Sequence, residues 1–362
     1  MSAHDRIEQL WWTKTEPPLW LRCIEPVYAA ISAMHLRRRA AHAMSAPLPL
    51  ISVGNISAGG SGKTPFVLWL ADSLQSKGYE PVILCRGDGG KATNARIIQP
   101  QDRAAEIGDE ARMLADLSAC PVIVAHDRCA GSQLAKGLGN LIILDDGFQY
   151  RHLERCCDIV LIPADGLGNG HQIPAGPLRE PITSLQRATM IVRTGNAADM
   201  EACEALSANT EYHWIREAGA LLDATGNCNI APQRVHAVTA IARPQRFFND
   251  LQNQGIKIDG RQTFPDHYAF TTADIQKITD LYLDIAVTAK DAVKLLPLWP
   301  DHRPLWLLPL QGHAEPELLS DVIRYLPLNL QKEKAREQSL LVNQMDDVEE
   351  ATAWEGAHDT QG

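Results

Sequence analysis

The fold of this 362-residue chain is decided by one stretch, Leu50-Ile-Ser-Val-Gly-Asn-Ile-Ser-Ala-Gly-Gly-Ser-Gly-Lys-Thr-Pro65. Its apolar first part, around Ile51 and Val53, predicts a buried strand. The glycines that follow predict a tight loop, and the residues from Phe66 onward predict a helix. A strand, a glycine loop and a helix in this order are typical of a loop that binds phosphate groups.

The loop also carries the side chains that a polyphosphate requires. Glycines let backbone N–H groups turn toward the phosphates, and the start of the helix adds the positive end of its dipole. Lys63 is expected to reach the terminal phosphates, and Thr64 is the expected magnesium ligand. The candidate nucleotide-binding residues are Ser57, Ala58, Gly59, Gly60, Ser61, Gly62, Lys63 and Thr64. The general motif has a glycine where this chain has Ser57. The alternative, a glycine-rich turn before a helix, gives no reason for the Gly-Lys-Thr sequence.

A second strong signal is the stretch Asn140 to Gln149, in which an apolar run ends in two adjacent acids, Asp145 and Asp146. Magnesium–nucleotide chemistry needs one carboxylate for the metal and one near the reacting oxygen. The alternative is a polar turn after a buried strand, with both acids solvated. We expect a functional role for both.

The rest of the chain alternates predicted strands with predicted helices. This alternation predicts a P-loop NTPase-like parallel sheet with helices on both faces, plus a second, smaller α/β domain. The predicted organisation has four parts: an N-terminal segment, residues 1–46; a P-loop kinase domain, 47–225; the smaller domain, 226–328; and a disordered acidic tail, 329–362.

Composition and charge restrict the possible functions. A hydrophobic content of 45% with 22% charged residues is ordinary for a soluble globular protein of this length. The formal net charge of -10 argues against nucleic acid as the main partner, because such binding needs a basic surface. The eight cysteines form no C-x-x-C pair, which argues against a zinc site and favours reduced thiols.

The N-terminal segment is rich in tryptophan: Trp11, Trp12 and Trp20 precede the first predicted strand. Pro26 is expected in the first turn of a helix that runs through Val27 to Met34 and ends at Arg37 to Arg39. Its apolar part is too short to cross a bilayer, which takes about 20 residues. Tryptophans beside a basic cluster fit a helix lying on an anionic membrane surface. A helix packed on the domain, with a solvated basic end, fits these residues equally well.

Together with two further motifs, Pro174 to Pro181 and Phe264 to His267, these stretches resemble the tetraacyldisaccharide 4′-kinases of lipid A biosynthesis. The resemblance covers roughly Pro47 to Leu310. It implies a P-loop ATPase domain joined by a strand-like hinge to a smaller α/β domain. The implied reaction is transfer of the ATP γ-phosphate to the 4′-hydroxyl of a disaccharide lipid A precursor. The implied location is the cytoplasmic face of the inner membrane, as a peripheral protein without an obligate protein partner.

The chemistry of phosphoryl transfer gives roles to individual residues. Lys63 would contact the β- and γ-phosphates, and Thr64 would bind magnesium together with one of the two acids, Asp145 or Asp146. The other acid would lie on the side of the nucleophile. The resemblance implies that Asp109 and His267 act as an acid–histidine pair that removes the proton of the sugar hydroxyl. Arg86, Gln149 and Arg179 are weaker candidates for substrate or phosphate contacts.

Two other classes of function remain as alternatives. The first is a P-loop kinase that acts on a small soluble alcohol. The second is a membrane-bound ATPase switch of the partitioning type, which has an extra lysine where this chain has Ala58. A GTPase is disfavoured, because the lysine of Thr288 to Asp291 stands one place too late for the guanine-reading pattern.

Overall fold

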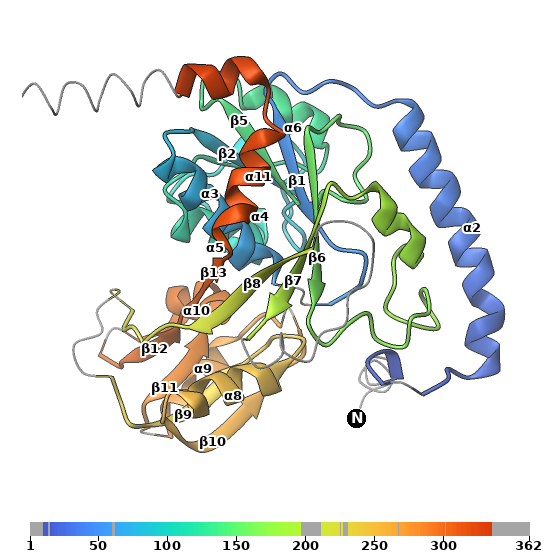
Figure 1. Cartoon of the computed structure of the whole chain (residues 1–362). Coiled ribbons are helices and arrows are strands. Elements are labelled where there is room, and N and C mark those ends of the chain that lie inside the picture. Colours follow the sequence, from blue (N-terminus) through green and yellow to red (C-terminus); the bar gives the residue numbers. More distant parts are fainter. Residues whose placement is uncertain are drawn as a thin grey trace, which may run out of the picture.

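The structure is a computed structural model of the chain. It describes residues 10–13, 15–59, 62–196, 211–224, 226, 231–266, 268–281, 283–300 and 302–334. Within these residues the strands form two sheets, a larger and a smaller one (Figure 1). The larger sheet has the order β13-β8-β7-β6-β1-β5-β2-β4-β3, and the smaller sheet has the order β10-β9-β11-β12.

The larger sheet is parallel except at its two edges. Its strands are β1 (Leu50–Gly54), β2 (Pro81–Cys85), β3 (Arg96–Ile97), β4 (Val122–Val124), β5 (Leu141–Asp145), β6 (Cys157–Pro163), β7 (Met190–Gly195), β8 (Glu211–Ala218) and β13 (Leu310–Ala314). β3 pairs antiparallel with β4, and β13 pairs antiparallel with β8. β1 lies between β5 and β6, with Val53 opposite Asp145. The glycine loop and the two acids therefore leave adjacent strands at the same edge.

Helices cover both faces of this sheet, as predicted. Successive residues of a buried strand point to opposite faces. Ile51 belongs to a core shared with α3 (Lys63–Ser76), α5 (Asp109–Leu117) and α11 (Pro316–Arg324). Leu50 belongs to the core on the opposite face, where α6 (Arg128–Leu134) packs. A short helix, α4 (Ala104–Ile107), precedes α5, and a 3-10 helix, η1 (Ile182–Arg187), precedes β7.

The smaller sheet is wholly parallel. Its strands are β9 (Arg234–Thr239), β10 (Lys257–Thr263), β11 (Ile285–Thr288) and β12 (Leu305–Leu308). On one face it packs against α8 (Pro244–Asn253), and on the other against α9 (Thr272–Thr279) and α10 (Ala289–Leu295). A short 3-10 helix, η2 (Leu296–Leu298), follows α10. We call this sheet and its helices the small unit, and the larger sheet with its helices the large unit.

Two antiparallel chain segments connect the units. The segment after β8 pairs with the segment that runs from β12 into β13, because Gly219 N donates to Pro309 O at 2.9 Å and Leu307 N donates to Leu222 O at 2.7 Å. β13 and α11 then return to the large unit, although the sequence predicts the small unit for all of residues 226–328. Leu330, from the predicted tail, is also buried in the large core. The acidic stretch 346–350 lies outside the described residues.

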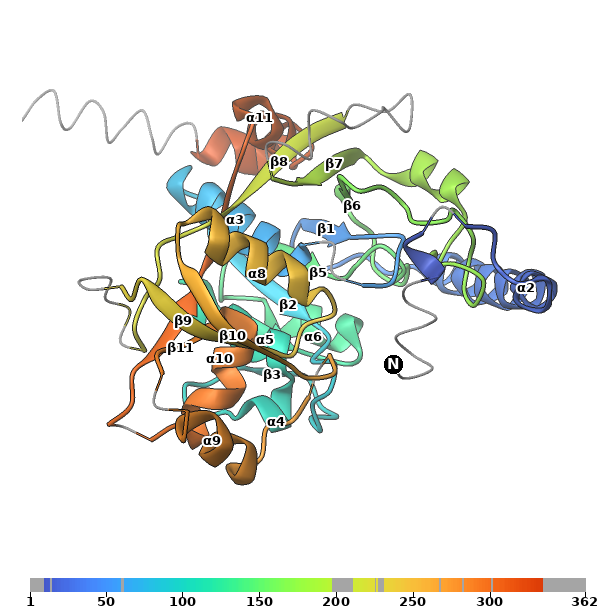
Figure 2. The same cartoon turned by 90° about the horizontal axis from the view of Figure 1, so that it is seen from below.

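The N-terminal helix, α2 (Leu19–Ala41), lies along the side of the large unit, away from the small unit (Figures 1 and 2). The predicted start at Pro26 is wrong, since the helix begins seven residues earlier, after Pro18. Pro26 lies inside it. A proline removes a single N–H from the helix, and here this loss does not end the 23-residue element. None of the helices in the described part of the chain is long and apolar enough to cross a membrane.

Candidate active site

The glycine loop leaves β1 and ends at the first residue of α3. Gly59 and Gly62 have φ angles of 96° and 77°, which residues other than glycine rarely adopt. Helix α3 begins at Lys63 rather than at Phe66, so that lysine lies at the positive end of the helix dipole. Gly60 and Ser61 lie outside the described residues. The described glycines have the backbone conformation that a phosphate-binding loop needs.

The loop is supported by the proline-rich segment after β6. Ala58 N donates to Pro177 O at 2.7 Å, and Arg179 N donates to Ile56 O at 2.7 Å. Ser57 forms an isolated bridge with Leu178. The segment Pro174 to Pro181 therefore lies beside the glycine loop, joined to it by these backbone hydrogen bonds and by the isolated bridge.

Lys63 and Asp146 are in direct contact. Lys63 Nζ lies 3.3 Å from Asp146 Oδ1 and 3.3 Å from Asn55 Oδ1. Arg179 reaches the same carboxylate, with its Nη1 3.1 Å from Oδ2. Burial alone would raise the pKa of Asp146, but Lys63 and Arg179 outweigh it and hold this pKa well below its usual range. Asp146 therefore stays ionised between two cations.

Asp145 has the opposite environment. It is almost fully buried, and its Oδ1 accepts the backbone N–H of Asp146 at 3.0 Å. Burial, followed by the charge of Glu110, raises the pKa of Asp145 to about 7, although Lys63 lowers it. Two adjacent carboxyl groups whose environments separate their pKa values are typical of a site with two distinct roles for its acids.

The oxygen donors at this edge suit a magnesium ion. Thr64 is nearly buried at the start of α3, and Asp145 ends the neighbouring strand. Magnesium prefers such hard oxygen ligands and usually takes one or two carboxylates, with water and substrate phosphates completing its shell. No group of three or more His, Cys, Asp or Glu side chains that could hold a metal occurs among the described residues. Thr64 and one of the two acids would hold an ion that is shared with a nucleotide.

The weaker candidates differ in what they contact. Arg179 contacts Asp146, as described. Gln149 Nε2 donates to Asn55 O at 2.8 Å and to Glu180 Oε1 at 3.2 Å. It thus ties the end of β1 to the proline-rich segment. Arg86 pairs with Asp88 at 3.1 Å and is largely exposed. The sequence motifs do not single out Asn55 and Glu180, which are buried polar residues next to the loop.

The predicted base, Asp109, faces the small unit. It begins α5, and Lys294 Nζ of α10 lies 3.6 Å from its Oδ2. Next to it, Lys290 Nζ lies 3.4 Å from Glu110 Oε1 and 3.5 Å from Asp266 Oδ1. His267 lies outside the described residues, so its pairing with Asp109 stays a prediction. Its neighbour Asp266 contacts Lys290, which also contacts Glu110, the residue after Asp109.

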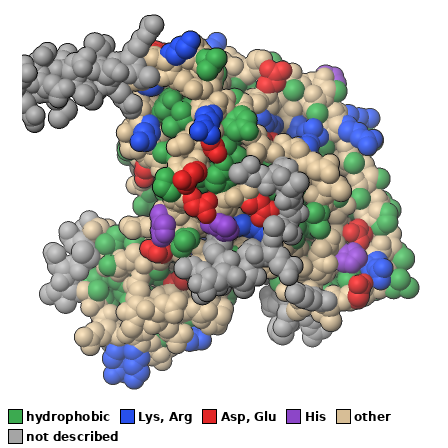
Figure 3. Space-filling view, viewed as in Figure 1, with side chains coloured by type: hydrophobic (Ala, Val, Ile, Leu, Met, Phe, Trp, Pro, Cys, Tyr) green, Lys and Arg blue, Asp and Glu red, His purple; other side chains and the backbone are tan. Residues whose placement is uncertain are grey.

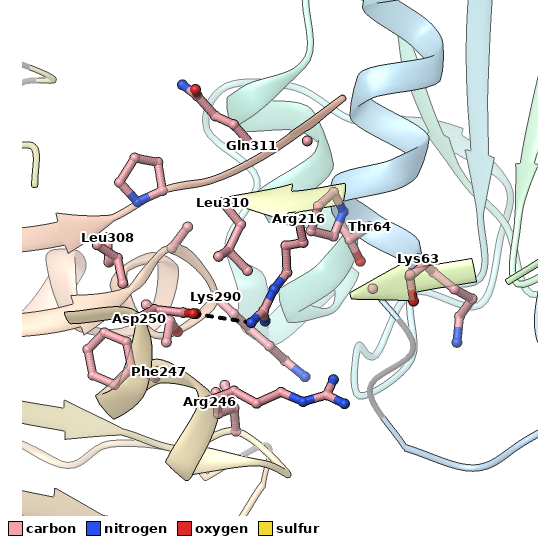
Figure 4. A pocket seen from close by; sticks show the side chains of 18 of the residues that line it. Lys63, Thr64, Arg216, Arg246, Phe247, Asp250, Lys290, Leu308, Leu310 and Gln311 are labelled. Carbon is pink, nitrogen blue, oxygen red and sulfur yellow. Dashed lines mark hydrogen bonds and ion pairs between the residues drawn. The ribbon is translucent and has the colours of Figure 1, made fainter. Parts of the chain in front are cut away.

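A cavity of about 1090 Å³ lies between the two units. Acidic side chains gather along this boundary in the space-filling view (Figure 3). The cavity is lined by the glycine loop, by the connecting segments and by α8 and α10, through residues that include Lys63, Thr64, Arg216, Arg246, Phe247, Asp250, Lys290, Leu310 and Gln311 (Figure 4). Arg216 of β8 pairs across it with Asp250 of α8 at 3.2 Å. Its volume is slightly above the range of about 300–1,000 Å³ that is typical of small-molecule sites.

Comparison with known proteins identifies the family. The model of the Tetraacyldisaccharide-1-P 4'-kinase family matches residues 18–326. The chain belongs to this family. A tetraacyldisaccharide 4'-kinase of Dechloromonas aromatica is 34% identical over 324 residues, which are 86% of this chain and 94% of that protein. One of Halorhodospira halophila is 36% identical over 322 residues, which are 84% and 95% of the two chains.

A solved structure of a family member is also similar. The crystal structure of the "apo" form of LpxK from Aquifex aeolicus in complex with ATP superposes with a TM-score of 0.71 at 29% identity. The similarity covers 84% of this chain and 98% of that one. The family assignment thus agrees with the resemblance that the sequence motifs suggested.

In this chain, Trp12 precedes the residues that match the family model and contacts the glycine loop. Trp12 packs beside Gly59 of the glycine loop, and the guanidinium carbon of Arg243, in the small unit, lies 3.6 Å from the centre of the Trp12 rings. Arg243 and Arg246 both pair with Asp165 of the large unit, at 2.6 and 3.0 Å. Arg243 therefore joins the N-terminal segment, the large unit and the small unit at the mouth of the cavity.

Proposed function

We propose that this chain is an ATP-dependent kinase that transfers the γ-phosphate of ATP to the 4′-hydroxyl of a tetraacyldisaccharide 1-phosphate. Family membership supports the substrate, and the complex of the similar LpxK with ATP supports the phosphate donor. The observation that carries the proposal is the contact of Lys63 with Asp146, 3.3 Å apart at the start of a helix. This contact supports the proposal, because transfer of a phosphoryl group needs a cation and an acid close together.

The roles of the residues follow from their environments. The N–H groups around Gly59 and Gly62 would cradle the phosphates, and Lys63 would exchange its contact with Asp146 for the β- and γ-phosphates. Thr64 and one of the two acids would hold magnesium, which supplies charge neutralisation on the phosphate oxygens when bound. The other acid would lie near the attacking hydroxyl.

Removal of the hydroxyl proton is assigned to Asp109 and His267. Asp109 lies at the boundary between the units, and the Phe264 to Asp266 segment reaches the same boundary through Lys290. Closure of the small unit over the large one would bring the base to the sugar and exclude water from the phosphoryl group. Asp109→Ala and His267→Ala should each lower kcat strongly, and the double variant should be little worse than the poorer single. Additive losses would contradict this pairing.

We also propose that α2 holds the protein on the membrane surface, at the cytoplasmic face of the inner membrane. Its exposed apolar residues, Trp20, Ile24, Val27, Ile31 and Met34, follow one another at steps of three or four residues. They therefore form one stripe along the helix. The packed side of the helix is fixed by Glu25, which accepts the Gln172 N–H at 2.7 Å. A stripe of this kind above a basic last turn suits an anionic bilayer.

The membrane proposal is tested by sedimentation with anionic vesicles. The double variant Val27→Asn/Ile31→Asn should lose most of its binding, because it removes apolar area from the stripe. Leu328→Asn is the matched control, since Leu328 is also exposed (68%) and does not belong to α2. Equal binding of the double variant and the wild type would overturn the proposal.

The reaction itself is tested with labelled ATP and the disaccharide 1-phosphate lipid. We expect a labelled bisphosphorylated lipid from the wild type. Lys63→Ala should lower turnover by orders of magnitude while the thermal melting curve stays similar. A chain that labels a soluble alcohol but not the lipid would be a different P-loop kinase.

A further inference from the structure

Two arginines of the small unit line the large cavity together with the glycine loop. Arg243 directly precedes α8, and Arg246 lies in the first turn of that helix. Gly59 and Lys63 line the same cavity from the large unit. Figure 4 shows the Arg246 side chain extending from α8 into the cavity, toward the side on which Lys63 lies. An arginine of one unit and the phosphate-binding lysine of the other thus share one open space.

The carboxylate that holds Arg246 lies at the sheet edge where the glycine loop begins. β5 and β6 lie on either side of β1. Asp165 follows β6 as Asp146 follows β5, so the two acids flank the glycine loop at the carboxyl edge of the sheet. The turn that carries Asp165 is tied to β7, because Ala164 N donates to Thr194 O at 2.9 Å. Thr194 in turn lies beside the loop, since its Oγ1 would be 3.8 Å from a Cβ at Gly62. Asp165 therefore places its cationic partners next to the loop.

A single oxygen of Asp165 accepts from both arginines. Arg243 Nη1 donates to Asp165 Oδ2 at 2.6 Å, and Arg246 Nη2 donates to the same oxygen at 3.0 Å. The Asp165 side chain is 49% exposed, and ion pairs of exposed groups stabilise a protein little. If Arg246 left, the shorter contact with Arg243 would remain, so Asp165 would not lose its counter-charge. Arg246 can therefore exchange this carboxylate for another anion at little cost.

The two arginines differ in how firmly they are held. The guanidinium carbon of Arg243 lies 3.6 Å from the centre of the Trp12 rings, and its side chain is 16% exposed. The Arg246 side chain is 32% exposed. Arg243 is thus fixed between Trp12 and Asp165, and Arg246 is the member of the pair that reaches into the cavity. This arrangement gives Arg243 the role of an anchor and leaves Arg246 for a ligand.

We propose that Arg246 is a catalytic residue that contacts the γ-phosphate during its transfer. This assignment rests on the proposed function. In that reaction the bond from the γ-phosphorus to the bridging oxygen breaks, and its electron pair leaves on ADP. The bond from the 4′-oxygen to phosphorus forms, and the hydroxyl proton passes to the base. Negative charge is spread over the transferring group in the transition state. The parallel N–H donors of a guanidinium group match two oxygens of that group.

The position of Arg246 in the small unit makes its contact depend on closure. Lys63 belongs to the large unit and meets the phosphates whether the units are open or closed, whereas Arg246 moves with α8. Its contact with the γ-phosphate therefore forms when closure also brings the base to the sugar. An interaction of this kind stabilises the transition state more than it stabilises bound ATP. In GTPases, an arginine that enters the site in this way raises kcat by about 10³–10⁵-fold.

The kinetic test separates turnover from ATP binding. Arg246→Gln should lower kcat with the lipid acceptor about 100-fold or more, while the Kd of ATP changes by less than about threefold. Arg246→Lys should recover only part of the loss, because an ammonium group keeps the charge without the two parallel donors. Arg261→Gln is the matched control. Arg261 lies in β10 of the small unit, is exposed and does not line the cavity, so this variant should behave as wild type.

A second readout does not depend on the acceptor. Fluoroaluminate, together with ADP and magnesium, mimics the transferring phosphoryl group. The wild type should bind ADP more tightly when fluoroaluminate is present, and Arg246→Gln should lose most of this gain while its thermal melting curve stays unchanged. The proposal is overturned if both proteins gain affinity equally or not at all, or if Arg246→Gln keeps the kcat of the wild type. A wild type that phosphorylates no lipid would contradict the proposed function, and the fluoroaluminate comparison would then decide for or against Arg246.

Discussion

Replacing Lys294 with methionine should disturb the boundary between the two units most directly. The Lys294 side chain is 7% exposed, and its Nζ lies 3.6 Å from Asp109 Oδ2 and 3.6 Å from Asp291 Oδ1. Asp291 is fully buried, and its Oδ2 already accepts from Thr239 and Thr288. At 3.6 Å and an effective dielectric constant of about 20, each pair has a Coulomb energy of about 5 kcal/mol. The cost of burying the charges offsets most of this energy.

The expected result combines stability and turnover. Removing one partner of a buried ion pair destabilises a protein by about 3–5 kcal/mol, because the other charge stays buried and unpaired. Asp109 retains 17% exposure, and Asp291 keeps the hydrogen bonds from Thr239 and Thr288, which favours the lower end of this range. Lys294→Met should therefore lower the free energy of unfolding by about 3 kcal/mol. It should also lower kcat at least tenfold, because Asp109 loses the cation that orients it. The KM for ATP should change little.

The assay is urea unfolding followed by steady-state kinetics at a temperature where the variant is folded. Lys294→Arg is the control, because it keeps the charge and should retain most of the stability. Wild-type stability and kcat in Lys294→Met would refute the reasoning, since the two 3.6 Å contacts would then stabilise nothing and α10 would not hold Asp109.

The other predictions concern the two acids and the mouth of the cavity. Asp145→Ala and Asp146→Ala should each lower kcat by orders of magnitude, and only loss of the metal ligand should raise the magnesium concentration needed for half-maximal turnover. If both variants had normal activity and an unchanged magnesium titration, the two acids would only form a polar turn after β5 and would have no catalytic role. Arg243→Ala should raise the KM for ATP several-fold, because it removes the contacts with Trp12 and Asp165 that hold the small unit near the glycine loop. Trp12→Ala should raise the KM for ATP less than Arg243→Ala does. Trp12→Phe should have a KM for ATP close to that of the wild type, since an aromatic face suffices for a cation–π contact. An unchanged KM in both alanine variants would show that this contact does not support closure.

The elements that the sequence predicts well are those with local signals. The apolar run before the glycine loop, the loop itself and the following helix lie within 27 residues, from Leu50 to Ser76, and the structure has them in the predicted order. The same holds for β5 and its two acids. Because the carboxyl ends of parallel strands share one edge, the proximity of Lys63 and Asp146 follows from the predicted topology.

The elements that the sequence does not predict depend on contacts between distant residues. β13 pairs with β8 about 100 residues earlier in the chain, and its central Gly312 lies against Trp214 so closely that a Cβ there would be 2.0 Å from the ring. Nothing in the short sequence Leu310 to Ala314 indicates this partner. The ion pairs of Lys290 and Lys294 with α5 are of the same kind, since they join helices of different units.

The start of α2 is mispredicted for another reason. Pro26 fits a residue of the first turn, where proline is common. Two further prolines, Pro17 and Pro18, stand directly before Leu19, the first residue of the helix. These prolines predict the observed start as well as Pro26 predicts the later one. Leu21, which only the earlier start includes in the helix, is buried.

The position of the transferred phosphate tests the central claim most directly. Wild-type protein would be incubated with ATP, magnesium and the tetraacyldisaccharide 1-phosphate, and the product examined by phosphorus–proton NMR correlation. We predict a new phosphate coupled to the proton at position 4′, formed in step with ADP release and absent with Lys63→Ala. No new phosphate on the lipid, or one coupled to a different ring position, would contradict the assignment.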